Sequence, residues 1–241
     1  MRNACRFLKP AAALVVVGAA LLANGCSSTF QTRGKAAVSP FLGDTSQFRE
    51  GTGDEAKLVY INPRADFRKY TQILLDPVVL VAADARSGSF ASMPKEDQQA
   101  VVNYVDARIR ATLGQDYTLV TSPGAAAMRL RVAITEAKGS TVLLDTLSSI
   151  TPPGIAINAL KTVATGTGAA VGRAGVEMEL QDSLTGERLA AGVDERAGRK
   201  YTLRFDKFSR YHAVESAFDH WAGRLRERLA AARAAKAAGK G

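Results

Sequence analysis

The sequence predicts an α+β fold: a single domain with a mixed, mostly antiparallel sheet packed by two main helices, after a cleaved N-terminal signal. Two observations predict this fold. Short segments alternate apolar and polar residues as half-buried strands do, and two longer segments carry apolar residues at helical spacing. Hydrophobic residues make up 46% and charged residues 23% of the 241 positions. This average balance excludes collagen-like, coiled-coil and wholly disordered chains.

The strand pattern is clearest at Met128–Glu136 and Val176–Gln181. Apolar residues occupy one face of each segment, while arginines occupy the other face of the first and glutamates that of the second. We expect the two strands to share a sheet in which these charges oppose each other, although two solvated faces that never meet would give the same pattern. Residues 174–194 should form a hairpin around the turn Asp182–Glu187. Residues 73–81 are rich in β-formers, but Pro77 favours an edge strand or a bulge.

Two segments have helical spacing. Pro94–Leu113 follows a capping Ser92, has acidic residues in its first turn and ends at Gly114. A longer helix is predicted from about Lys207 to Lys236. Its apolar residues form one stripe that should pack on the sheet: Tyr211, Val214, Phe218, Trp221, Leu225 and Leu229.

The first 25 residues have the organisation of a bacterial secretory signal. Met1–Lys9 is cationic, and residues 10–23 are uncharged and mostly apolar. This stretch is shorter than the about 20 apolar residues that a membrane-spanning helix needs. A cationic start, a short apolar region and small residues at its end are typical of a cleaved signal, which here ends before Cys26.

Two interpretations of the cleavage site cut the same bond and differ only in the fate of Cys26. Ala23-Asn24-Gly25 satisfies the small-x-small rule of ordinary signal peptidase, but before a cysteine it is also similar to the lipobox of bacterial lipoproteins. The only other cysteine, Cys5, leaves with the signal. Acylation of Cys26 explains a lone exported thiol. Ser27 favours, by resemblance to sorted lipoproteins, the outer membrane with the domain facing the periplasm.

We expect residues 26–57 to be a lipidated N-terminus and polar tether with a few docking points, because Ser, Thr, Gly and charge prevail there. Patterning tightens from Leu58, which predicts an α+β domain over 58–236 and a flexible basic tail over 237–241. The net charge of +9 is concentrated at the two ends, and the middle is near neutral. The C-terminal run RLRERLAAARAAKAAGKG has no aromatic residues, so nucleic-acid binding is not predicted.

Residues 139–172 are the least typical part of the sequence, because the whole segment holds only two charged residues, Asp145 and Lys161, and has Pro152-Pro153-Gly154 in its middle. One interpretation is two short buried helices joined at the proline turn. The other is an exposed apolar flap that binds lipid or a partner through Ile150, Ile155, Ile157 and Leu160.

No catalytic, cofactor-binding or metal-binding pattern is present. The two histidines, His212 and His220, stand eight residues apart on the final helix, too far apart for a shared i, i+4 metal site. There is no nucleophile elbow and no Walker motif. We therefore expect no enzymatic activity and no cofactor.

Three stretches carry a family resemblance: SPFLGDTSQF at 39–48, LVYINPRADFRKYTQILLDPVVL at 58–80, and LRVAITEA at 130–137 together with VEMELQDSLTGERLAAGVDERAG at 176–198. Together they resemble the bacterial lipoproteins of domain-of-unknown-function family 3313. The resemblance implies an envelope lipoprotein and carries over no catalytic residues.

The function predicted from the sequence is a lipid-anchored envelope module that acts through protein contacts. It would be held on the membrane by acylated Cys26, with an envelope protein as its partner. The alternative is a lipoprotein that binds a lipid or small ligand with the apolar segment 139–172. A hydrolase would need a cleft with converging polar groups.

Overall fold

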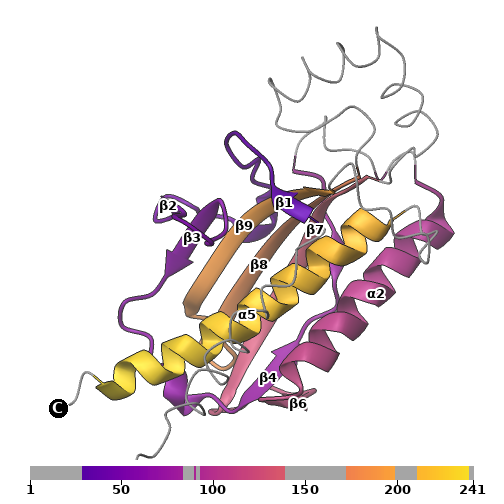
Figure 1. Cartoon of the computed structure of the whole chain (residues 1–241). Helices are drawn as coiled ribbons and strands as arrows, with labels where there is room; N and C mark the ends of the chain where they lie inside the picture. Colours follow the sequence, from indigo (N-terminus) through magenta and orange to yellow (C-terminus); the bar gives the residue numbers. More distant parts are fainter. Residues whose placement is uncertain (1–28, 84–89, 91–92, 139–171, 199–210, 239–241) are drawn as a thin grey trace, which may run out of the picture.

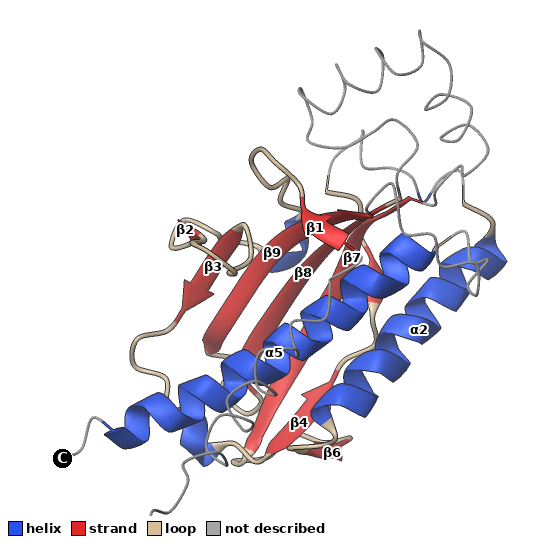
Figure 2. Ribbon diagram, viewed as in Figure 1, coloured by secondary structure: helices blue, strands red, loops and turns tan. Residues whose placement is uncertain are grey.

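The computed structural model describes residues 29–83, 90, 93–138, 172–198 and 211–238. These residues form one nine-stranded sheet and two long helices, α2 (Lys95–Leu113) and α5 (His212–Ala238), which lie together across one face of the sheet (Figure 2). The strands are β1 (Thr29–Gln31), β2 (Arg49–Glu50), β3 (Leu58–Ile61), β4 (Gln72–Leu75), β5 (Val79–Leu80), β6 (Thr118–Val120), β7 (Ala127–Lys138), β8 (Arg173–Asp182) and β9 (Arg188–Gly198).

The sheet has the strand order β2-β3-β9-β8-β7-β4-β6, with β1 also paired to β9 and β5 to β7. The pairs on the β1, β2, β3, β8 and β9 side are antiparallel, whereas β4 and β5 run parallel to β7, and β6 runs parallel to β4. The predicted α+β class with a mixed, mostly antiparallel sheet and two main helices is confirmed.

The long hairpin of β8 and β9 lies at the centre of this sheet, and β7 pairs with its first strand. The predicted pairing of β7 with β8 is present, with Arg131 directly opposite Glu179. Met128, Leu130, Val132 and Ile134 are each 0% exposed, so the predicted apolar face of β7 is fully buried. The sequence period and the packing agree on this face.

The segment around Pro77 matches its prediction only in part, because β5 pairs with β7 alone among the described strands whereas β4 does not lie at an edge. It forms two short strands, β4 and β5, separated by Asp76–Val78. β4 is not an edge strand, because β6 and β7 flank it on both sides. Pro77 has no backbone N–H to donate to a neighbouring strand, and the break between β4 and β5 falls at this residue. Asp76, just before it, still donates its backbone N–H to the carbonyl oxygen of Leu130 at 3.0 Å.

Both helices follow their predicted extents. α2 begins one residue later than expected and meets Gly114 at its end; its predicted cap, Ser92, lies outside the described residues. The described part of α5 begins at His212, and residues 207–210 of the prediction lie outside. Val214, Phe218, Trp221 and Leu229 are buried against the sheet and α2, as the apolar stripe predicts. We call this side of the sheet the helix face.

The opposite side, which we call the N-terminal face, is covered by residues 36–48, including the short helix η1 (Pro40–Leu42). Leu42 is 2% exposed, and Phe41 and Phe48 pack in the same cluster, over Ala191 and Val193 of β9. The described part of the predicted tether is therefore integrated into the fold. Its apolar residues bury surface on the sheet, and β1 adds a strand to β9.

Candidate functional site

The residues that the sequence singled out as sites, Cys26 for lipidation and Ile150, Ile155, Ile157 and Leu160 for a lipid or partner surface, lie outside the described residues. Their flanking positions are described. Lys138 at the end of β7 faces Arg173 at the start of β8, and β1 begins three residues after Cys26.

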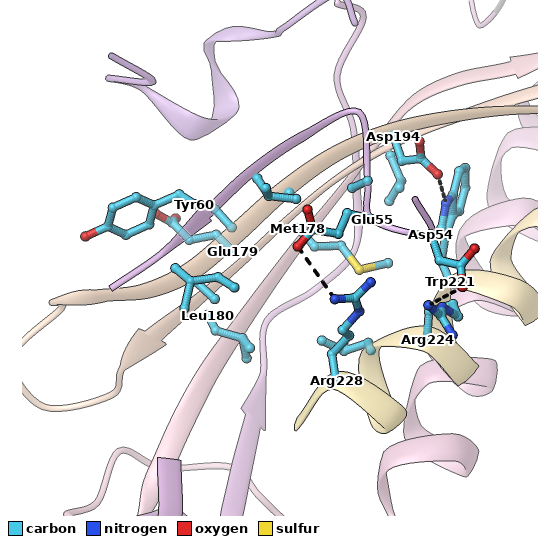
Figure 3. Close-up of a pocket in the computed structure, with 18 of the residues that line it drawn as sticks. Asp54, Glu55, Tyr60, Met178, Glu179, Leu180, Asp194, Trp221, Arg224 and Arg228 are labelled. Atoms are coloured by element: carbon cyan, nitrogen blue, oxygen red, sulfur yellow. Dashed lines mark hydrogen bonds and ion pairs between the residues drawn. The ribbon is translucent and has the colours of Figure 1, made fainter. Parts of the chain in front are cut away.

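A groove of about 370 Å³ lies on the helix face, between β3, β8 and β9 on one side and the middle of α5 on the other (Figure 3). Its volume is within the range of small-molecule sites, about 300–1,000 Å³. The lining is largely apolar and includes Val59, Ile61, Met178, Leu180 and Leu225. We call this cavity the β9–α5 groove.

Small residues of β9 create the space. Gly192 and Ala190 line the β9–α5 groove where most neighbouring strand positions carry larger side chains. A Cβ at Gly192 would lie 3.4 Å from Cβ of Ala56, which is ordinary van der Waals contact. An alanine could therefore be accommodated there, and any larger side chain would occupy the groove.

A buried polar cluster closes one end of the groove. The Asp194 carboxylate accepts hydrogen bonds from Trp221 Nε1 at 2.7 Å and from Gln31 Nε2 at 2.5 Å. Burial raises the pKa of Asp194, although these hydrogen bonds act in the opposite direction. The cluster joins β1, β9 and α5, so it holds the groove walls at a fixed separation.

Ion pairs from one loop to α5 border the other side of the groove. Arg224 lies 3.3 Å from Asp54, and Arg228 lies 3.6 Å from Glu55 (Figure 3). Glu55 also binds Arg49 through two hydrogen bonds of 2.7 and 2.9 Å, and Arg49 holds the pKa of Glu55 near 2. Because positive and negative groups alternate here, the rim has no strong net charge.

The two histidines occupy different surroundings. His220 lines the groove, where burial and then the charges of Arg196 and Arg224 lower its pKa to about 4. His212 lies at the start of α5, 3.9 Å from Glu215. Residues eight apart on a helix are separated by about 12 Å along its axis. The part of the chain that the structure describes contains no group of His, Cys, Asp and Glu side chains that could hold a metal ion.

The N-terminal face buries two carboxylates, Glu177 and Glu179. Glu177 is 0% exposed, and its two carboxylate oxygens accept hydrogen bonds from Ser39 N at 2.5 Å and from Ser39 Oγ at 2.7 Å. Burial raises the pKa of Glu177. Glu179 is paired with both Arg131 and Arg188 at 2.5 Å. Arg188 in turn donates to the backbone carbonyls of Leu42 and Asp44, so these charges fasten residues 39–44 to the sheet.

These two regions differ in what they can do. The buried carboxylates of the N-terminal face, Glu177 and Glu179, have their partners within the protein, so that face is a packing interface. The β9–α5 groove presents apolar surface with a few oriented polar groups, the composition of a binding site. Trp221 and Leu225 belong to the apolar stripe that the sequence predicts for packing. The groove could not be predicted in the same way, because its one sequence signal is the pair of small residues Ala190 and Gly192, and these mark a cavity only when α5 lies opposite them.

Comparison with known proteins places the chain in a family. The family described as "Protein of unknown function (DUF3313)" matches residues 37–225, and the chain belongs to it. The sequence resemblance is thereby confirmed. No curated protein matches the sequence.

Solved structures with similarity to this chain are distant. The PelC dodecamer from Paraburkholderia phytofirmans has 12% identity and a TM-score of 0.37, over 70% of this chain and 94% of that one. Lipoprotein GNA1162 from Neisseria meningitidis has 15% identity and a TM-score of 0.30, over 66% and 98%. Protein XCC0632 from Xanthomonas campestris, of the family DUF330, has 13% identity and a TM-score of 0.35, over 68% and 86%.

Proposed function

We propose that the protein is a bacterial envelope lipoprotein, anchored by acylated Cys26, whose folded domain binds the apolar part of an amphiphilic ligand in the β9–α5 groove without catalysing a reaction. The groove itself is the observation that carries the proposal. It combines a volume of about 370 Å³, an apolar lining and a rigid polar end at Asp194 and Trp221.

The remaining described surface supports a groove rather than a flat interface. The exposed large apolar residues in the described ranges are Ile61, Val79 and Leu184, one each on β3, β5 and the β8–β9 turn. Protein-binding patches are usually contiguous and apolar, and these three residues are on different elements. Ile61 alone adjoins the groove, where it is 55% exposed.

The alternating charges at the rim fit an amphiphile. An acyl chain or a similar apolar group would lie along Met178, Leu180 and Leu225, while its polar end would remain near Arg224 and Asp54 in contact with water.

A test can use the fluorescent anionic amphiphile 1-anilinonaphthalene-8-sulfonate as the probe. Ala190→Leu should fill the groove and reduce probe fluorescence several-fold, whereas Ala230→Leu, on the exposed side of α5, should leave it unchanged. Equal binding by both folded variants and by the unsubstituted protein would refute the groove as the ligand site. Circular dichroism of each variant would establish that the fold is intact.

A protein partner is the second candidate, because Ile61 extends the apolar lining of the groove onto the surface. A partner that inserts apolar side chains should be lost from in-cell crosslinks with both Ile61→Asp and Ala190→Leu. A small ligand would be lost with Ala190→Leu and retained with Ile61→Asp, since Ile61 lies at the outer edge.

A further inference from the structure

Our further inference concerns how the domain is oriented on the membrane, and it rests on the proposed acylation of Cys26. The starting observation is that the folded body begins very close to that residue. β1 starts at Thr29, so only Ser27 and Ser28 separate it from Cys26. Three Cα–Cα steps span at most about 11 Å even when fully extended.

The beginning of β1 is firmly held in the sheet. Thr29 is 1% exposed and pairs with Gly198 at the end of β9. Arg196 donates from Nε to Thr29 Oγ1 at 3.0 Å and from a terminal nitrogen to the Thr29 carbonyl at 2.9 Å. The linker between the proposed anchor at Cys26 and the sheet is therefore short, Ser27 and Ser28 alone, instead of the long tether over residues 26–57 that the sequence predicts.

This fixed point lies at one end of the long strands (Figure 1). Thr29 is beside Gly198, Ala197 is paired with Arg173, and Arg173 is paired with Lys138, so the end of β9, the start of β8 and the end of β7 meet there. The β8–β9 turn with Leu184 lies at the other end. A ten-residue strand such as β8 separates the two ends by about 30 Å.

Exposed charge in the described residues at these strand ends is basic. Arg33 and Lys35 are exposed in the turn after β1, and Lys138 is exposed at the end of β7. In the described residues 29–35, 136–138, 172–173 and 197–198, every exposed charged residue is one of these three. The nearby Glu195 is paired with Lys57 at 2.7 Å.

We infer that this end of the sheet rests on the membrane surface, with Arg33, Lys35 and Lys138 facing anionic lipid headgroups and the β8–β9 turn pointing away. The linker of at most about 11 Å keeps this end of the sheet close to the headgroups while Thr29 stays paired, whereas the opposite end lies about 30 Å away along the strands. Basic residues near an anionic surface add a salt-sensitive attraction.

The inference can be tested by fluorescence quenching from lipids that carry a nitroxide on the headgroup. The full mature chain, acylated on Cys26, is reconstituted in vesicles of phosphatidylcholine and phosphatidylglycerol. Because its own cysteine is blocked, a single reporter thiol can be labelled at Lys138→Cys, at Lys35→Cys or, as the distal control, at Leu184→Cys. Labels at 138 and 35 should be quenched several-fold more than the label at 184.

Equal quenching at 138 and 184, or stronger quenching at 184, in acylated and vesicle-bound protein would overturn the orientation and leave the proposed anchor intact. If intact mass shows no acyl groups and the protein does not bind vesicles, both the anchor and the orientation fail. For the electrostatic part, Lys35→Gln should lower the quenching at 138 in phosphatidylglycerol vesicles at low salt. The matched change Arg64→Gln, exposed near the distal turn, should not; equal effects would refute a role for the basic residues.

Discussion

The two faces of the sheet bury their residues by different physical means. On the helix face, α2 and α5 cover aliphatic and aromatic side chains such as Leu130, Ile134 and Phe218. On the N-terminal face, residues 36–48 cover a mixture of a small apolar cluster and the carboxylates Glu177 and Glu179. The helix face leaves part of its apolar surface uncovered as the β9–α5 groove, whereas the N-terminal face closes on its own polar groups.

This difference shows why one side of the sheet is free to act as a binding site. A buried charged group must be paired or hydrogen-bonded in a fixed geometry, so few segments can cover it. The N-terminal face is therefore committed to residues 39–44. Apolar surface is less demanding, so the space that α5 leaves unfilled over the helix face can accept a ligand.

The largest expected effect is on the helix face. Phe218 is 1% exposed and forms an edge-to-face pair with Trp221 at 4.9 Å. Phe218→Ala should lower the free energy of unfolding by about 3–5 kcal/mol, the usual cost of emptying a large buried aromatic site. Urea unfolding measures this, and Leu184→Ala, at a residue that is 62% exposed, should change it by less than about 0.5 kcal/mol. Similar losses for both variants would contradict the packing of α5 described here.

The next effect tests the charges of the N-terminal face. Glu179→Ala removes the carboxylate between Arg131 and Arg188. We expect a loss of about 3 kcal/mol in the free energy of unfolding, because two partly buried guanidinium groups lose their counter-charge. Glu50→Ala, an exposed carboxylate on β2, is the matched control and should be near neutral. A loss below about 1 kcal/mol for Glu179→Ala would mean that this pair behaves as a surface ion pair.

A smaller effect tests how the N-terminal segment is fastened. Ser39→Ala removes the hydroxyl that donates to Glu177 and leaves one carboxylate oxygen of a buried residue without that partner. The expected loss is about 1–2 kcal/mol. Ser46→Ala, which removes a comparable but exposed hydrogen bond to Asp44, should change the unfolding free energy by less than about 0.5 kcal/mol. Proteolysis of residues 36–48 should also become faster in Ser39→Ala; identical protection would argue against this fastening.

The smallest effect is a pH dependence of opposite sign on the two faces. Burial lowers the pKa of His220 to about 4 from 6.5, so the stability linked to neutral His220 is present above pH 6.5 and is lost as the pH falls towards 4. Burial raises the pKa of Glu177 above 4.5, so its contribution is present below pH 4.5 and is lost as the pH rises.

The measurement is urea unfolding of the unsubstituted protein, His220→Gln and Glu177→Gln between pH 4 and pH 7. As the pH falls, the unsubstituted protein should lose stability relative to His220→Gln and gain stability relative to Glu177→Gln. Parallel curves for all three proteins would show that neither group titrates differently on folding.

Much of the fold followed from local patterns in the sequence. The alternation in β7 and β8, the hairpin and the stripe of α5 each depend on residues within one or two elements, and each is confirmed. The role of residues 36–48 did not follow, because the bond between Ser39 and Glu177 joins positions 138 residues apart. An alternating polar face has the same sequence whether water or another segment covers it.

The β9–α5 groove could not be predicted from the sequence for a related reason. Ala190 and Gly192 are ordinary small residues in a strand until α5 crosses opposite them. The alternative predicted from the sequence was ligand binding by the apolar segment containing Ile150, Ile155, Ile157 and Leu160, which lies outside the described residues. An apolar run is visible in a sequence, whereas a cavity arises from what neighbouring elements fail to fill.

Native mass spectrometry of the protein extracted from the bacterial envelope tests the central claim most directly. The account predicts a chain that starts at an acylated Cys26 and carries an additional non-covalent mass, which Ala190→Leu loses and Ala230→Leu keeps. An acylated chain without any bound mass in every preparation, or a mass that Ala190→Leu retains, would contradict ligand binding in the β9–α5 groove.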